Sequence, residues 1–171
     1  REVDGVTVEP DRVAVTIGAS GGFILTMLAC FDVGDRVGVC RPGYPAYRNM
    51  LTAGGIEVVD IPIGPENGYV PTPADVAAAG HLQGLVLASP SNPTGTVIPE
   101  ARLVELVDQV EAGGGWLVSD EIYHGITYSG PAATAAGRSD RVVVVQSMSK
   151  YYSMTGWRVG WLVLPETLIR P

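Results

Sequence analysis

The chain has 171 residues, of which 46% are hydrophobic and 17% charged, a composition that suits one soluble globular domain with a sizeable core. Eighteen acidic against eleven basic residues give a formal net charge of -7, which disfavours nucleic acid and anionic membrane surfaces as partners. The longest apolar run, residues 23–31, is too short to span a bilayer, and the N-terminal end carries no export signal, so we expect a cytoplasmic protein without a transmembrane segment.

Short runs of Val, Ile and Leu recur along the chain, and they are continuous rather than alternating with polar residues. Such runs are typical of strands that are covered on both faces, as in a mostly parallel sheet. The predicted strands are residues 13–17, 37–40, 56–61, 85–88, 116–119, 142–146 and 159–164.

Helical patterns lie between several of these runs, and the clearest of them, residues 99–112, begins with a proline and ends before a glycine triplet. The other predicted helices are residues 21–31, 45–53 and 73–79. Alternating strands and helices indicate an α/β fold with a three-layer, doubly wound, mostly parallel sheet. Because we find no linker, repeat or low-complexity tract, residues 1–171 are expected to form a single domain.

Ligands bind at the carboxyl ends of the strands in such sheets, so the residues that follow each strand are the candidate site residues. After the first predicted strand, Ala19, Ser20 and Gly21 belong to a run of small residues that opens a helix. The free backbone N–H groups there could hold a phosphate. A tight strand-to-helix turn also needs glycine for its own geometry, so this run alone leaves both interpretations open.

Two further strands end in polar residues. Asn92 lies between prolines that fix the backbone and direct its amide, although the same turn-forming residues could make only a rigid loop. Asp120 ends an apolar run, where a buried carboxylate needs a cationic or hydrogen-bonding partner. A helix N-cap is the alternative for Asp120, and the adjacent Glu121 is expected to be structural or on the surface.

The most specific cluster follows the sixth predicted strand, where Ser147, Ser149 and Lys150 precede Arg158. Lys150 is the single lysine beside ten arginines, so any side-chain amine chemistry must use it. An arbitrary lysine belongs on a solvated face. A desolvated lysine near other cations has a lowered pKa and becomes a nucleophile that forms a Schiff base with an aldehyde.

The cysteines and histidines give no support for a metal site. Cys30 and Cys40 lie in apolar stretches without the spacing of a zinc site or a disulfide framework, and we expect buried, reduced thiols. His81 and His124 are far apart in the sequence and have no metal-ligand spacing.

Taken in order, the segments 91–95, 119–123, 147–150 and 156–158 resemble the signature of fold-type-I pyridoxal-phosphate-dependent aminotransferases of class I/II, the aspartate aminotransferase-like enzymes. The resemblance extends over nearly the whole chain. It implies the large domain of such an enzyme, which transfers an amino group between an L-amino acid and a 2-oxo acid as a homodimer.

The same resemblance assigns roles to individual residues. Lys150 would form a Schiff base with pyridoxal 5'-phosphate and afterwards act as the general base, and Asp120 would keep the pyridine nitrogen protonated. Asn92 and Tyr123 would hydrogen-bond the 3' oxygen of the ring, and Tyr44 would stack on it.

The resemblance further implies a phosphate cup that combines helix N–H groups, hydroxyls and a guanidinium. Its members would be Ala19, Ser20, Gly21, Ser147, Ser149 and Arg158. Tyr47 and His124 lie near these motifs, and we assign them packing or supporting roles rather than direct catalytic ones.

Members of the family are longer, with an N-terminal segment and a C-terminal small domain that have no counterpart here, so we expect the 171 residues to be part of a longer chain. Other functions remain open on the same scaffold. One is a carbon–sulfur β-lyase, a second is a non-catalytic sensory domain of a transcription regulator, and a third is an inactive isolated scaffold. The amino donor is not predicted.

Overall fold

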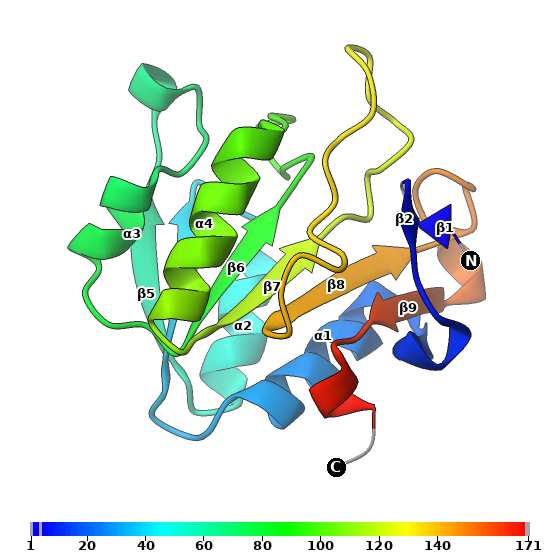
Figure 1. The fold of residues 1–171 in the computed structure, drawn as a ribbon, viewed down its shortest axis with the longest axis horizontal. Coiled ribbons are helices and arrows are strands. Elements are labelled where there is room, and N and C mark those ends of the chain that lie inside the picture. Colours follow the sequence, from blue (N-terminus) through cyan, green and yellow to red (C-terminus); the bar gives the residue numbers. More distant parts are fainter. Residues whose placement is uncertain (1, 4, 170–171) are drawn as a thin grey trace.

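A computed structural model describes residues 2–3 and 5–169, which form a central sheet with helices on both faces (Figure 1). The described residues make a seven-stranded sheet in the order β3-β9-β8-β7-β6-β4-β5, and a separate pair of short strands, β1 and β2, lies beside it. The strand bounds are β1 Glu2–Val3, β2 Val6–Thr7, β3 Val13–Ile17, β4 Arg36–Arg41, β5 Glu57–Pro62, β6 Gly84–Ala88, β7 Trp116–Asp120, β8 Val142–Ser147 and β9 Val159–Val163.

The direction of the strands decides which residues share an edge. The strands β5, β4, β6, β7 and β8 are parallel, whereas β9 is antiparallel to both of its neighbours, β8 and β3. It follows that β3 runs in the same direction as β8. The predicted mostly parallel, doubly wound sheet is confirmed.

The helices form the two outer layers. Helices α1 (Gly18–Cys30) and α2 (Pro45–Ala53) cover one face, and α3 (Pro73–Ala78) and α4 (Glu100–Ala112) cover the other (Figure 1). Short 3₁₀ turns occupy Pro10–Arg12, Pro65–Asn67, Thr155–Trp157 and Glu166–Leu168. Within the described ranges, no helix is long and apolar enough to cross a membrane.

Each face of the sheet has its own apolar core. Phe23 of α1 and Leu51 of α2 pack against the sheet on one side, and Leu103 and Leu106 of α4 pack on the other. Every residue of β8 is buried, because alternate side chains enter the two cores. The continuous apolar runs therefore correctly predicted central strands that are covered on both faces.

Two expectations fail at the edge of the sheet. Val15 and Ile17 of β3 are 78% and 77% exposed, because β3 is an edge strand and α4 packs farther along the sheet, on β7. Continuity of apolar residues does not reveal whether a second layer covers an edge strand. Helix α1 also begins at Gly18, three residues earlier than predicted.

Gly160 lets the start of α1 lie directly on the sheet. It pairs with Thr16 on one side and Ser147 on the other. A Cβ atom at position 160 would lie 2.7 Å from the carbonyl carbon of Gly18, 2.8 Å from the oxygen of Gln146 and 2.9 Å from the nitrogen of Ala19. All three are backbone atoms, so they cannot move aside by a change of rotamer.

We therefore expect Gly160→Ala to lower the free energy of unfolding by about 2 kcal/mol, the range typical of overpacking. Denaturant unfolding measures the loss. The control is Gly156→Ala in the neighbouring 3₁₀ turn, where an added Cβ has no atom within 4 Å, and its effect should stay within about 0.5 kcal/mol. Equal stability of the two variants would contradict this account of the contact.

Candidate active site

The predicted site residues converge on one edge of the sheet. The strands β3, β6, β7 and β8 end at this edge, and the antiparallel β9 begins there. The segments 18–21, 91–92, 120–123 and 147–150 therefore follow strands that end side by side, and Arg158 precedes the strand that starts between two of them.

Asp120 is the last residue of β7, and only 4% of it is exposed. Its Oδ2 accepts a short hydrogen bond from the Tyr47 hydroxyl, and its Oδ1 accepts the Ile122 N–H at 3.2 Å. The residues that follow form a turn rather than a helix, so the alternative of a helix N-cap is wrong. Burial raises the pKa of Asp120 to about 6, against the opposing effects of the two hydrogen bonds and of His124 and Lys150.

Tyr47, to which the sequence assigned only a packing or supporting role, is the side chain that donates to the buried Asp120. Burial, and then the neighbouring charge of Asp120, raise the pKa of its phenol well above the usual range, so the hydroxyl stays protonated and remains a donor. Tyr44 lies just before α2, and its ring centroid lies 5.4 Å from that of Tyr47. The three-residue spacing was the available signal, because such residues share one side of a helix start.

Lys150 lies in the turn after β8, and its side chain is exposed in the described structure. Its Nζ is 5.6 Å from the centroid of the Tyr123 ring, and its charge lowers the pKa of Asp120. Lys150, Tyr123 and Asp120 therefore lie near one another at this edge of the sheet.

A cradle for an anion adjoins these residues. Gly18 begins α1 with a φ of 66°, and a Cβ there would lie 2.5 Å from Nη2 of Arg158, so the guanidinium lies against the start of the helix. The hydroxyls of Ser147 and Ser149 are 2.7 Å apart at the end of β8. A helix N-terminus, a guanidinium and two hydroxyls together make a suitable environment for a phosphate.

Arg158 itself has an unusual backbone conformation. Its φ of 53° is in the left-handed region, which a residue with a Cβ adopts at some cost. This conformation joins the 3₁₀ turn at Thr155–Trp157 to β9, and the guanidinium donates to the Thr155 oxygen at 3.1 Å. Strained residues of this kind concentrate at functional sites.

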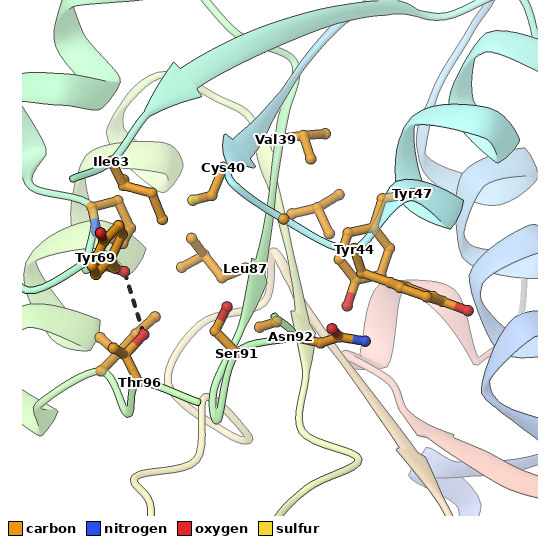
Figure 2. A pocket seen from close by; sticks show the side chains of 15 residues that line it. Val39, Cys40, Tyr44, Tyr47, Ile63, Tyr69, Leu87, Ser91, Asn92 and Thr96 are labelled. Carbon is orange, nitrogen blue, oxygen red and sulfur yellow. Dashed lines mark hydrogen bonds between the residues drawn. The ribbon is translucent and has the colours of Figure 1, made fainter. Parts of the chain in front are cut away.

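Tyr44 and Asn92 line a hollow beside the buried acid. Its empty volume is about 380 Å³, part of it open to solvent, and its wall also includes Tyr47. Figure 2 shows Tyr44, Tyr47 and Asn92 on one side of this hollow and Tyr69 and Thr96 on the other. Much of the remaining lining is apolar: Val39, Ile63, Leu87 and Ile98. The hollow lies beyond the carboxyl ends of β4 and β6, at the same edge of the sheet at which β7 and β8 end.

The two cysteines are free and half-buried, and burial raises the pKa of both thiols to about 12. Such thiols are poor nucleophiles at neutral pH. In the part of the chain that the structure describes, no group of three or more His, Cys, Asp or Glu side chains is arranged to hold a metal ion.

Comparison with known proteins places this geometry in a family. The model of the family "Aminotransferase class I and II" matches residues 2–170. The chain belongs to this family. The predicted family is therefore confirmed, and members of this family depend on pyridoxal phosphate.

Individual proteins that the chain resembles are also named as aminotransferases. The chain is 53% identical to a valine–pyruvate aminotransferase of Mycobacterium tuberculosis over 97% of its own length and 44% of the relative's. It matches the crystal structure of an aminotransferase from the same organism with a TM-score of 0.92 and 53% identity, over 97% of this chain and 46% of that one. It matches the structure of a Thermus thermophilus aspartate aminotransferase double mutant with a TM-score of 0.91 and 35% identity, over 97% of this chain and 44% of that one. The chain thus spans less than half the length of these relatives.

The hydrogen bond from Tyr47 lowers the pKa of Asp120, so its removal should raise that pKa further above about 6. We expect Tyr47→Phe to move the titration midpoint of this carboxyl to higher pH, as measured by carbon NMR of aspartate side chains. Tyr44→Phe, which leaves the Tyr47 hydroxyl in place, is the control. An unchanged midpoint in Tyr47→Phe would mean that the phenol does not tune the acid.

Proposed function

We propose that the chain binds pyridoxal 5'-phosphate through Lys150 and is the cofactor-binding large domain, residues 1–171, of an aminotransferase. The observation that carries this proposal is the placement of Lys150 and the buried Asp120 at one sheet edge, next to the anion cradle of α1 and Arg158. The residues present fit the cofactor, since its phosphate needs an anion site and its pyridine nitrogen needs an acid.

The phosphate would be held by the α1 N–H groups of Ala19, Ser20 and Gly21, with Arg158 supplying the opposite charge. The hydroxyls of Ser147 and Ser149 would add hydrogen bonds. The burial of Gly18 beneath the guanidinium supports this assignment, because any side chain there would separate Arg158 from the helix start.

Residues at the carboxyl ends of β6 and β7 would hold the ring. Asp120 would face the pyridine nitrogen, with Tyr47 fixing the orientation of the carboxylate from the side of α2. Tyr44 would stack on the ring, and Asn92 and Tyr123 would donate hydrogen bonds to its 3' oxygen. A cation at the ring nitrogen would favour the ionised form of Asp120, whose pKa burial alone raises.

The bound cofactor would supply an electron sink that acidifies the Cα hydrogen of an attached amino acid. Lys150 would anchor the cofactor and would carry the proton to and from the Cα atom of the substrate. Its exposed side chain in the turn after β8 supports this role, because the amine is free to change its orientation.

The proposed reaction is amino transfer between an L-amino acid with a small apolar side chain and pyruvate. Two observations favour this substrate class. The relative at 53% identity is named a valine–pyruvate aminotransferase, and the hollow beside Tyr44 and Asn92 has an apolar wall.

We also propose that the natural protein that carries these residues is a cytoplasmic homodimer. The side chains of Val15, Ile17 and Leu28 are apolar and exposed, and their burial against a second subunit would remove them from water.

Lys150→Ala should abolish covalent capture of the cofactor. We expect borohydride reduction of the protein with pyridoxal phosphate to add one cofactor mass to the peptide that contains Lys150, and to add nothing to the variant beyond the N-terminal amine. Mass spectrometry measures both, and the comparison is clean because the chain has a single lysine. Equal labelling elsewhere in the two proteins would exclude Lys150 as the anchor.

The reaction itself is tested by a donor screen on the natural protein that carries these residues. We expect pyruvate to become alanine fastest with valine and similar apolar donors, about tenfold or more above aspartate, because a charged side chain loses solvation against an apolar wall. A carbon–sulfur β-lyase would instead release pyruvate and ammonia from a thioether substrate without an oxo-acid acceptor. Cofactor binding without either reaction would favour a sensory domain.

A further inference from the structure

Glu121 is a fully buried carboxylate that the proposed mechanism does not use. It follows Asp120 directly, and its exposed fraction is 0%. Its Oε1 accepts hydrogen bonds from the Ser119 hydroxyl at 2.9 Å and from the Ala135 N–H at 2.7 Å. Its Oε2 accepts one from the Thr134 hydroxyl at 2.6 Å. The side chain thus joins the end of β7 to a segment that is distant in sequence.

The same side chain also closes the turn in which it lies. The His124 Nδ1 is 3.6 Å from the Glu121 Oε2, and the His124 N–H donates to the Glu121 carbonyl at 3.0 Å. Burial raises the pKa of Glu121, and its hydrogen-bond donors and His124 oppose this rise. A buried acid with this many partners is costly to disturb, because each partner would be left without its acceptor.

The turn 121–125 contacts the segment that follows β8 and carries Lys150, here called the lysine loop, at two points. The Tyr123 ring lies under the Lys150 Nζ at 5.6 Å. Tyr151 is the residue that follows Lys150. A Cβ atom added at Gly125 would lie 2.6 Å from the Tyr151 ring, so this ring packs directly on the turn. Whatever fixes the turn therefore also fixes the distance between Tyr123 and the lysine loop.

We propose that Glu121 is a positioning residue for the candidate active site. By clamping the turn 121–125 to Thr134 and Ala135, it holds Tyr123 and Gly125 against the loop that carries Lys150. The part that concerns the cofactor rests on the proposed function, whereas the clamp itself does not.

The clamp is tested first without cofactor, by hydrogen exchange in Glu121→Gln. This variant keeps the shape of the side chain but removes its charge and replaces one acceptor oxygen with a donor. We expect the amides of residues 122–126 to exchange about tenfold faster than in the wild type, a change typical of a lost charge-assisted hydrogen bond. Amides of α4 should follow global stability only.

The second measurement is made with bound pyridoxal phosphate. Glu121→Gln should weaken cofactor affinity about tenfold and shift the pH midpoint of the bound cofactor's visible absorbance, because Tyr123 would no longer be held in place. The control is Leu106→Ala on the buried face of α4, which lowers stability without removing a hydrogen bond to Glu121. It should leave the exchange of 122–126 relative to α4, the affinity and the midpoint unchanged.

The outcomes separate the hypotheses. If Glu121→Gln behaves like Leu106→Ala, or if exchange rises while affinity and midpoint stay fixed, the positioning role is wrong. If Glu121→Gln does not fold, Thr134→Val removes one donor to the same carboxylate, and smaller shifts in the same directions are required. A wild-type protein that binds no cofactor would refute the proposed function, and the exchange data would still decide whether Glu121 holds the turn.

Discussion

The Asp120 carboxylate lies at the end of a central strand, almost without solvent, and a buried acid is tolerated there only if other groups satisfy its oxygens. Tyr47, in the first turn of α2, donates a hydrogen bond to one oxygen, and the backbone N–H of Ile122 donates to the other. This one requirement links three elements, β7, α2 and the turn 121–125. The residues that surround the proposed cofactor ring come from these elements and from the neighbouring loops.

The antiparallel direction of β9 brings Arg158 into the candidate site. Because β9 starts at the edge where β3 and β8 end, Arg158 reaches the start of α1 although it precedes its strand. Gly18 and Gly160 allow this approach, since the helix start, the strand and the guanidinium meet where no Cβ fits. The anion cradle therefore depends on backbone packing as much as on charge.

Much of this arrangement could be predicted from the sequence, because continuous apolar runs mark the strands and polar residues at their ends mark the edge. Asp120, Asn92, Ser147 and Lys150 were assigned to this edge in this way, and they lie there in the structure. The bond from Tyr47 could not be found, since it joins residues far apart in the chain and depends on how α2 packs. The exposure of Val15 and Ile17 depends on which strand lies at the edge, and local composition carries no information on that order.

The pairing of β3 with β9 joins opposite ends of the chain, Val13 with Val163. Contacts so distant in sequence carry a large loop-closure entropy, and they form late unless other structure has already brought the ends together. The loop between β8 and β9 joins strands that are close in sequence, so its closure costs less entropy. Lys150 and Arg158 can therefore become neighbours before α1 packs on the sheet. The anion cradle is then among the last features to assemble, and a nascent or truncated chain would lack it even with most of its sheet in place.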